Sequence, residues 1–461
     1  METLQRTANR GSISTASYEI DNSCKFEADN SESMARTNSS EGDKQKCTLS
    51  VWVKRTELSD GFFFTAGDTV NPWFILGFYQ NQFYWSTTAG TSAGGVMQTN
   101  RVFRDTSAWY HIVLAIDTTQ GTDTNRYKLY VNGIQETSFG TANYPSQNAN
   151  LQIMDDLPQD VGGYTSYFYC GYIAEFVAID GSQLAPTEFG EVDSDTGIWI
   201  PKDVSGLTFG TNGFHLDFKD ASNLGNDASG GTDFTLTNIT AADQATDTPT
   251  NNFCTFNVVN MTGNTAKLAE GATFTASTAN GAFTTYGTMA PSAGKWWWEG
   301  KIQVFGDTAY ACIGATTNLS GLPSVSAQLS GGHVIKLAKA QKWVLNDTGY
   351  SYGAAYADGD IINVGLDLDN RKFYSYKNGT IDDANGIDIS STTFDGFGSQ
   401  WMPLVITYGS GGASSYEINF GGYRTYGIGS AASDANGYGT FEYAPPSGYY
   451  ALCTKNLAEF G

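Results

Sequence analysis

Positive charge is scarce in this sequence, in which 25 Lys and Arg residues stand against 47 Asp and Glu residues and the formal net charge is -22. A chain so rich in negative charge repels a phosphate backbone, and no cluster of Lys and Arg offsets this repulsion. We therefore expect no nucleic-acid partner. An acidic surface keeps a protein soluble, and although carboxylates also hold divalent cations, a solvated surface is the simpler interpretation.

Long apolar runs are also missing. The N-terminus, Met-Glu-Thr-Leu-Gln-Arg-Thr, has no apolar segment of the kind that a secretory signal peptide needs. No stretch approaches the roughly 18 consecutive apolar residues that cross a bilayer as a helix. We therefore expect a protein that is made and folded in a cytoplasm and has no membrane partner.

Cysteine and histidine, which often serve in catalysis or metal binding, are few and scattered. The six cysteines form no Cys-x-x-Cys pair, and His111, His215 and His333 lie in separate segments. We expect buried free thiols in a cytoplasmic chain, although the sequence also allows a Cys24–Cys47 disulfide. No Ser/His/Asp arrangement, nucleophile elbow or phosphate-binding loop is visible in the sequence.

Aromatic residues and glycine, in contrast, are abundant. Aromatic residues make up 14% of the chain, and 53 glycines stand against 11 prolines. Aromatic side chains suit half-buried strands, and glycine forms tight turns with Asn, Asp and Ser. Alternation over Thr48–Arg55 and the Asn132-Gly133 turn between two apolar segments predict short antiparallel strands, and a helical turn at 185–190 is the exception. The predicted fold class is all-β, with two tandem antiparallel β-sandwich (jelly-roll) domains.

Composition along the chain predicts where these domains begin and end. Residues 1–12 are polar and irregular, which predicts an N-terminal arm, and the first sandwich is expected over 13–221. Residues 222–253 are polar and rich in turn formers, which predicts a linker containing one short strand at 234–238. The second sandwich is then expected over 254–461. At roughly 150 residues per domain, this length corresponds to two or three domains.

The first domain resembles a laminin-G-like or concanavalin-A-like jelly roll in three passages that occur in the family's order. Leu49–Arg55 is similar to its strand with a Trp-Val-Lys core. Trp109–Asp117 followed by Tyr127–Gly133 is similar to its hairpin, and Gly171–Gly181 followed by Leu184–Phe189 is similar to its last strand and helical turn. The resemblance implies a two-sheet sandwich.

The second domain resembles the SPRY fold. Gly294–Ile302, which reads Gly-Lys-Trp-Trp-Trp-Glu-Gly-Lys-Ile, is similar to that family's Trp-rich strand. Asp358–Asn370 followed by Phe373–Gly379 is similar to its Gly-Asp segment and its Asn-Gly hairpin. This match is the more specific of the two.

The tandem arrangement, together with the opening segment Leu4–Tyr18, is similar to virion proteins of tailed bacteriophages, which include tail fibres, appendages and other structural proteins. The resemblance implies a non-catalytic protein exposed on the virion and released by host lysis. It implies other virion proteins as partners, a homo-oligomer for which a trimer is the common form, and a host-surface glycan or receptor as the ligand. A capsid decoration or head-fibre protein that stabilises the particle is the alternative.

A polysaccharide hydrolase is the third possibility, because the jelly-roll superfamily includes glucanases with a Glu-x-Asp-x-Glu strand. Glu19-Ile-Asp21 begins this motif, but Ser23 stands where the third carboxylate belongs. The Glu191-Val-Asp193-Ser-Asp195 segment also lacks a terminal glutamate. We therefore expect no catalytic residues.

Two candidate sites remain. Asp227 and Asp233, in a Gly-kinked loop, offer the hard oxygen ligands that Ca²⁺ prefers, although turn statistics favour an ordinary Asx/Gly turn. No other cofactor is expected.

Tyr79, Tyr84 and Trp85 could form a carbohydrate-binding platform, with use in the core as the alternative. In the Trp296-Trp297-Trp298 run, alternation is expected to bury either Trp297 or its two neighbours, but not all three.

Overall fold

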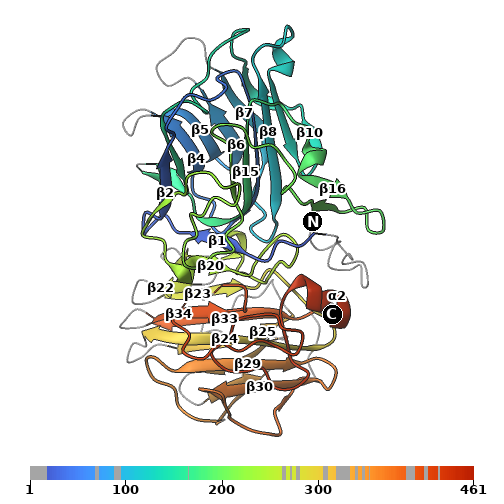
Figure 1. Ribbon diagram of the computed structural model, residues 1–461. Coiled ribbons are helices and arrows are strands. Elements are labelled where there is room, and N and C mark those ends of the chain that lie inside the picture. Colours follow the sequence, from blue (N-terminus) through green and yellow to red (C-terminus); the bar gives the residue numbers. More distant parts are fainter. Residues whose placement is uncertain are drawn as a thin grey trace. The chain divides into compact units, whose positions relative to one another are not determined.

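The computed structural model describes residues 18–67, 72–87, 95–164, 166–261, 266–269, 273–276, 281–304, 310–317, 333–337, 341–344, 348–351, 353–390, 400–409, 414–423 and 426–461 (Figure 1). The chain divides into two compact units between Thr250 and Asn251. We call residues 18–250 the first unit and residues 251–461 the second unit. The predicted N-terminal arm, residues 1–12, lies outside the described residues.

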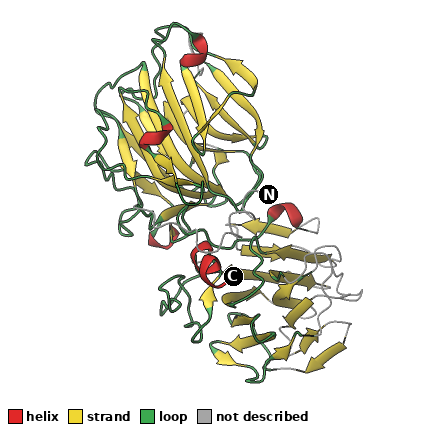
Figure 2. Cartoon of the chain, turned by 90° about the vertical axis from the view of Figure 1, so that its right-hand side faces the viewer, coloured by secondary structure: helices red, strands yellow, loops and turns green. Residues whose placement is uncertain are grey.

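Strands make up nearly all the regular structure in both units, and the helices are short (Figure 2). Neighbouring strands pair antiparallel, except that β24 and β35 of the second unit pair parallel. The predicted all-β, antiparallel fold is therefore confirmed. Among the described residues, no helix combines the length and the apolar character needed to cross a membrane.

Two eight-stranded sheets form the first unit. One follows the order β10 (Ile134–Glu136), β9 (Tyr127–Val131), β8 (Tyr110–Asp117), β3 (Lys46–Arg55), β15 (Gly171–Asp180), β1 (Ser23–Phe26) and β20 (Gln244–Ala245), with β18 (Phe214–Leu216) paired to β15. The other follows β11 (Phe139–Asn143), β7 (Val96–Val102), β6 (Gln82–Ser86), β5 (Pro72–Tyr79), β4 (Gly61–Gly67), β12 (Pro158–Val161), β2 (Ser33–Thr37) and β19 (Thr235–Thr237). We call the first of these sheet A and the second sheet B.

Short elements join these strands. Two small sheets pair β13 (Gly163–Tyr164) with β14 (Tyr167–Phe168), and β16 (Gly190–Val192) with β17 (Trp199–Pro201). The 3-10 turns of this unit are η1 (Asp123–Asn125), η2 (Pro186–Glu188) and η3 (Ala241–Asp243). The turn η2 confirms the helical turn expected at 185–190. Asn132 and Gly133 have φ values of 49° and 77°, as the predicted two-residue hairpin turn between β9 and β10 requires.

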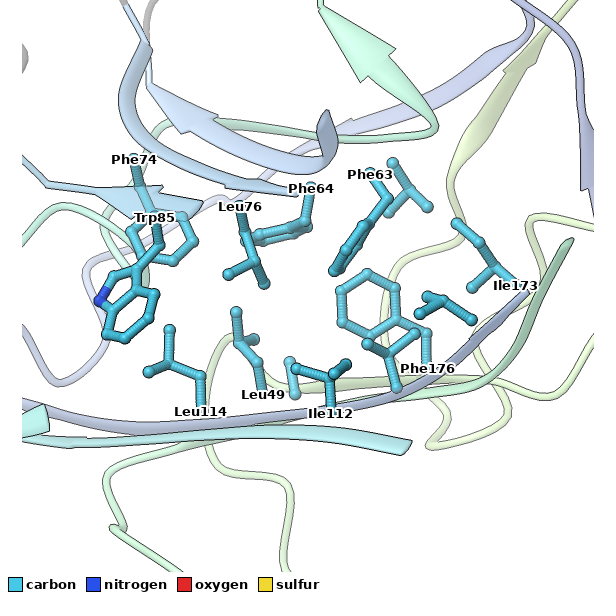
Figure 3. Close-up of a cluster of buried hydrophobic side chains, with 14 of the residues drawn as sticks. Leu49, Phe63, Phe64, Phe74, Leu76, Trp85, Ile112, Leu114, Ile173 and Phe176 are labelled. Carbon is cyan, nitrogen blue, oxygen red and sulfur yellow. The ribbon is translucent and has the colours of Figure 1, made fainter. Parts of the chain in front are cut away.

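Sheets A and B face each other across an apolar core (Figure 3). The side chains from β4, β5 and β6 are Phe63, Phe64, Phe74, Leu76 and Trp85, and those from β3, β8 and β15 are Leu49, Ile112, Leu114, Ile173 and Phe176. Each of them is at most 1% exposed. Since burial of one such side chain contributes about 1.5–3 kcal/mol, this layer supplies much of the stability of the unit.

We expected a linker over residues 222–253, but residues 222–250 are packed into the first unit instead. Phe234 is 2% exposed and belongs to the core between the sheets, and β19 pairs with β2. Asp247 is 1% exposed and accepts hydrogen bonds from Lys54 Nζ at 2.6 Å and Trp109 Nε1 at 3.0 Å. The polar composition of this segment therefore reflects tight turns and buried ion pairs, which a sequence pattern does not distinguish from a solvated linker.

Two further sheets form the second unit. The nine-stranded sheet follows β21 (Ala266–Ala269), β22 (Thr273–Ala276), β34 (Ser414–Asn419), β24 (Lys295–Val304), β29 (Ile361–Asp367), β30 (Lys372–Lys377) and β31 (Thr380–Ile381), with β32 (Ile387–Asp388) paired to β30 and β35 (Tyr450–Ala451) paired to β24. The six-stranded sheet follows β23 (Gly281–Tyr286), β33 (Met402–Gly409), β25 (Tyr310–Thr316), β26 (His333–Leu337), β27 (Gln341–Val344) and β28 (Thr348–Ser351). The helices are η4 (Val258–Asn260) and α2 (Thr454–Phe460).

The tryptophan run on β24 is buried completely, which corrects our expectation. Trp296, Trp297 and Trp298 are 0%, 1% and 1% exposed. Trp296 and Trp298 belong to the main core of the second unit, whereas Trp297 belongs to a separate apolar cluster and packs edge-on against Tyr376 at 5.0 Å. Alternation still sends neighbours to opposite faces, but the C-terminal segment around Phe441 covers the second face.

All six cysteines, Cys24, Cys47, Cys170, Cys254, Cys312 and Cys453, are buried and free. The expectation of buried free thiols is confirmed, and Cys24 and Cys47 form no disulfide.

The Asp247–Lys54 ion pair provides a test of how residues 222–250 are held. We expect Asp247→Ala to lower the free energy of unfolding of the first unit by about 3–5 kcal/mol, because it removes one partner of a buried pair. The matched control is Asp195→Ala at an exposed position, for which we expect a change within about 0.5 kcal/mol. The free energies of unfolding are measured by chemical denaturation. Equal effects of the two variants would contradict the role of the Asp247–Lys54 pair in holding this segment.

Candidate functional site

Tyr79 and Tyr84 lie on the face of sheet B that points away from the core. They flank the turn between β5 and β6, where Gln80 and Asn81 have φ values of 54° and 63°. Because side chains alternate along each strand, Phe83 turns into the core, and Tyr79 and Tyr84 turn outward. Both tyrosines are half-buried, and their ring centroids lie 5.7 Å apart.

Two further rings, which sequence reasoning missed, lie next to these tyrosines: Phe62, which is buried at 7% exposure, and Tyr167. Phe62 of β4 lies 6.1 Å from Tyr84, and Tyr167 of β14 lies 5.3 Å from Phe62. Tyr167 is 44% exposed. We call Tyr79, Tyr84, Phe62 and Tyr167 the aromatic strip.

A glycine makes the strip continuous. Gly77 of β5 is paired with Tyr84 on one side and with Phe62 on the other, so it lies between the two rings in one cross-strand row. A Cβ atom at Gly77 would stand 3.0 Å from Phe62 Cδ1 and 2.3 Å from the carbonyl oxygen of Gly61. Only glycine therefore allows Phe62 to lie this close to β5.

The Phe62 and Tyr167 positions were not predictable from alternation. Residues 61–65 read Gly-Phe-Phe-Phe-Thr, and a register shift between Phe62 and Phe64 turns both Phe63 and Phe64 inward. A bulge of this kind leaves no signal in a run of identical residues. Tyr167 stands on a two-residue strand that only the tertiary structure brings to Phe62.

Trp85, the third residue predicted for the platform, is not part of the strip. It is 0% exposed and packs edge-on against Tyr127 at 6.0 Å and Phe139 at 5.9 Å. Figure 3 shows its indole in the layer between the sheets. As the next residue after Tyr84 on the same strand, Trp85 must point to the opposite face, so it serves the core.

Amide side chains border the strip, and the carboxylate of Asp60 accepts a hydrogen bond from the backbone N–H of Gln80, next to Tyr79, at 2.6 Å. Gln82 and Gln98 stand beside Tyr79 and Tyr84 in the strand register, and Gln98 Nε2 donates to Gln82 Oε1 at 2.7 Å. Each amide offers two N–H donors and a carbonyl acceptor, and the tyrosine hydroxyls both donate and accept. Apolar ring faces bordered by hydrogen-bonding groups suit an amphipathic ligand.

The predicted calcium pair, Asp227 and Asp233, has a different role. Asp227 is buried, and its Oδ2 accepts a hydrogen bond from Arg36 Nη1 at 3.1 Å. Its Oδ1 accepts hydrogen bonds from the backbone of His215 and from Ser229. The Arg36 guanidinium at this distance already neutralises the Asp227 carboxylate and would repel a cation. Asp227 therefore forms an ion pair with Arg36 within an ordinary turn, which is the alternative to a calcium site that turn statistics favour.

Asp233 stabilises the same loop from outside. It is exposed, its Oδ1 accepts from the backbone N–H of Asp227 at 2.9 Å, and its Oδ2 accepts from Asn223 Nδ2 at 2.8 Å. The Asx turn of this loop is formed by Asp227, whose Oδ1 accepts from the backbone N–H of Ser229 at 3.0 Å.

Two other groups of described residues bring three possible metal ligands within 4.8 Å of one another. In the first, Glu27, Glu57 and Cys170, burial and then the charge of Glu27 raise the pKa of Glu57 to about 7, and burial raises that of the Cys170 thiol. Protonated groups bind metals poorly, so this group is better described as hydrogen-bonded.

The second group, Glu41, Asp155 and Asp156, already has a cation beside it. Lys44 Nζ lies 2.9 Å from Glu41 and 3.1 Å from Asp155. Neither group therefore adds a metal centre to the strip.

His111 is a structural residue. It is 1% exposed and stacks between Trp52, at 4.6 Å, and Trp199, at 5.9 Å. Trp199 Nε1 donates to His111 Nδ1 at 2.8 Å, so Nε2 carries the proton and donates to Ser50 Oγ at 2.8 Å. In this tautomer His111 cannot accept a proton from Ser50, and the pair is no nucleophile–base dyad.

The carboxylates considered for hydrolysis are not arranged for it. Glu19 and Asp21 are exposed and precede β1, and Glu191 and Asp193 lie on or beside the small strand β16. Glu175 is buried in β15 with a positive φ of 44°, and its carboxylate accepts hydrogen bonds from Tyr18 and His215. Glu19 and Asp21 therefore do not lie on the strand that the glucanase motif requires.

The ion pair at Asp227 gives a direct test of the calcium expectation. We expect Asp227→Asn to cost about 3–5 kcal/mol of stability because it leaves the buried charge of Arg36 without its counterion. Asp233→Asn, in the same loop, serves as the control and should cost about 1 kcal/mol or less. Added Ca²⁺ should not change the Tm of the wild-type chain. If Ca²⁺ raises the Tm of the wild-type chain and either variant abolishes this rise, the loop binds calcium and our interpretation is wrong.

The buried environment of His111 predicts a pH dependence. Burial lowers the pKa of His111 from 6.5 to about 3. The unfolded chain therefore binds a proton near pH 6.5 whereas the folded chain does not, so the contribution of His111 is complete above pH 6.5 and declines as the pH falls toward 3.

The measurement is an NMR titration of the imidazole nitrogens, with His111→Asn assigning the signal. We expect a neutral Nε2–H tautomer throughout the range from pH 7 to about pH 4. A His111 resonance that titrates near pH 6.5 would contradict the burial of this ring between Trp52 and Trp199.

Comparison with known proteins bears on the fold of these units. Residues 29–184 match the family model for the concanavalin A-like lectin/glucanases superfamily. A search of curated proteins found no match. The matched region contains all four residues of the aromatic strip, and the match supports the predicted concanavalin-A-like domain in the first unit.

Among solved structures, the SPRY domain of human HERC1 is similar at 15% identity and a TM-score of 0.29, over 35% of this chain and 96% of that domain. Another human SPRY domain is similar at 15% identity and a TM-score of 0.27, over 34% and 97%. A heptameric SAP-like pentraxin from Limulus polyphemus is similar at 14% identity and a TM-score of 0.29, over 37% and 80%. At these TM-scores, the SPRY-like fold of the second unit stays a prediction.

Proposed function

We propose that this chain is a non-catalytic binding protein, exposed on a tailed-phage particle, and that the aromatic strip of its first unit contacts a glycan on the host surface. The strip is the observation that carries the proposal. It brings Tyr79, Tyr84 and the buried Phe62 of sheet B together with the exposed Tyr167 of the small strand β14. Aromatic faces hold the apolar face of a sugar ring, and hydroxyl and amide groups bond its rim.

The lectin-like match of the first unit supports a binding role, because that match and the strip fall in the same region of the chain. The phage setting rests on the resemblance of the tandem arrangement to virion proteins. In that setting the partners are other virion proteins and further copies of this chain, with a trimer as the expected form.

The position on the particle decides between this proposal and a capsid decoration protein. Cryo-EM or immunogold localisation of the chain on intact particles makes the distinction. Density at the tail or on projecting fibres supports host attachment. Density spread over the capsid shell would instead assign the chain to particle stabilisation and overturn the attachment role.

The strip itself is tested by Tyr84→Ala. Tyr84 is the central ring, in contact with both Tyr79 and Phe62, so its loss should weaken binding to host cells or to host-surface glycans about tenfold. The control is Val192→Ala, which removes an exposed apolar side chain on β16 outside the strip. Affinity is measured by surface binding, and circular dichroism checks that each variant is folded. If Tyr84→Ala binds with unchanged affinity, the proposed site is wrong.

A further inference from the structure

We infer that Lys25, Asp243 and Glu32 of the first unit form a site of spontaneous cross-linking, in which Lys25 Nζ and the Asp243 carboxyl group condense to an amide with the loss of one water molecule. This inference does not depend on the proposed glycan contact. Three observations carry it, namely the position of the two reacting groups in the sheet, their burial, and the polar groups around the Asp243 carboxyl.

The register of sheet A places the two reacting residues side by side. In the antiparallel pairing of β1 with β20, the last pair of residues is Cys24 with Gln244, so the next residues along the two segments are Lys25 and Asp243. Lys25 Nζ lies 3.3 Å from Asp243 Oδ1. Two groups that the fold already holds in contact react without the entropic cost of an encounter.

All three side chains are buried, since Lys25, Glu32 and Asp243 are 1%, 3% and 5% exposed. Glu32 Oε2 lies 3.2 Å from the same amine. Charges are costly to bury, so these surroundings favour transfer of a proton from the Lys25 ammonium to the Asp243 carboxylate. The transfer produces a neutral amine, which is a nucleophile, and a carboxyl group, which is a better electrophile than a carboxylate.

A second lysine has the same chemical neighbours but is open to solvent. Lys44 Nζ lies 2.9 Å from Glu41 and 3.1 Å from Asp155, and the side chains of Lys44 and Glu41 are 24% and 63% exposed. The hydrogen bond to Glu41 is the largest cause of a raised pKa at Lys44, which keeps this amine protonated. We therefore expect no amide at Lys44, and this group is a matched control within the same chain.

Thr240 supplies the groups that stabilise the intermediate. Asp243 Oδ2 accepts hydrogen bonds from the backbone N–H of Thr240 at 2.8 Å and from its hydroxyl at 3.2 Å. When the lone pair of Lys25 Nζ forms a bond to Asp243 Cγ, negative charge develops on Oδ2. Hydrogen-bond donors that are already in place stabilise such a charge.

Glu32 moves the remaining proton. Its carboxylate takes a proton from the nitrogen of the tetrahedral intermediate and gives it to Asp243 Oδ1, which leaves as water when the Cγ–Oδ1 bond breaks. Burial raises the pKa of Glu32, so its carboxylate is a stronger base than that of an exposed glutamate. The reaction needs no further reactant, because the ammonium and the carboxylate together contain the atoms of one amide and one water.

The bond would join β1 to the turn η3, which lies near the other end of the first unit. Because all six cysteines are free, disulfides do not supply such a link. A covalent link between positions far apart in the sequence restricts the unfolded chain, as a long-range disulfide does. The amide would therefore hold residues 222–250 against the first strand even after local unfolding.

The experiment measures the intact mass of the full wild-type chain by mass spectrometry under denaturing conditions. We expect a mass below that of the sequence by one water molecule. Peptide mapping should then find the peptide that contains Lys25 joined to the peptide that contains Asp243, with Lys44 unmodified. A folded wild-type chain with the full mass and separate peptides overturns the inference.

Two variants identify the groups that react. Lys25→Arg keeps a positive charge beside the carboxylates, but a guanidinium does not lose its proton, so this variant should show the full mass. Glu32→Gln keeps the size of the side chain but cannot carry the proton, and it should form the bond at least about a hundredfold more slowly. Circular dichroism checks that both variants are folded. If either is not, the wild-type peptide map decides by itself.

The remaining outcomes would overturn parts of the inference. An aspartyl succinimide also loses one water, but that loss would persist in Lys25→Arg and would join no peptides, so this result rejects the cross-link. A bond from Lys25 to Glu32 would reject Asp243 as the electrophile. Unchanged bond formation in Glu32→Gln would reject Glu32 as the proton carrier, and an amide at Lys44 would show that burial does not select the site.

Discussion

Aromatic packing between sheets A and B is the interaction on which the rest of the first unit depends. Phe63 and Phe64 each contact Phe176 edge-on in the middle of this layer, at ring distances of 6.3 and 5.4 Å. These contacts fix β4 against β15 and thereby fix which residues of β4 can point outward. Phe62 reaches the aromatic strip because the bulge that places Phe63 and Phe64 in the core leaves it on the other face. The candidate binding surface is the reverse side of the core.

Buried ion pairs then hold the long final segment of the unit. Arg36 pairs with Asp227, Lys54 pairs with Asp247, and Lys25 lies 3.3 Å from Asp243. Each cation comes from a strand near the start of the chain, and each carboxylate comes from residues 227–247. Such pairs contribute little net stability compared with apolar residues, but removing one partner is costly. They therefore specify where the segment lies more than how strongly the unit folds.

In the second unit, a buried carboxylate holds the C-terminal segment in place. Glu299 of β24 is 0% exposed and accepts hydrogen bonds from Tyr426, from Asn363 and from the backbone N–H groups of Glu442 and Tyr443. Burial raises the pKa of Glu299 to about 7, while these donors oppose the rise. One carboxylate thus fastens the C-terminal segment over the face of the sheet on which Trp297 lies, which explains why a strand that alternates by sequence is buried on both faces.

The sequence by itself determined the strand content, the Asn-Gly hairpin at Asn132, the helical turn near Pro186 and the buried thiols, because each depends on local backbone preference or on composition. It grouped Tyr79 and Tyr84 with their neighbour Trp85 as one platform, and so did not separate the outward from the inward residues of that strand. The tertiary structure alone decided that Trp85 is core, that Asp227 serves Arg36, that residues 222–250 are packed, and that Phe62 and Tyr167 extend the strip. Each of these depends on a bulge or on contacts between residues far apart in the chain, and neither leaves a local signal in the sequence.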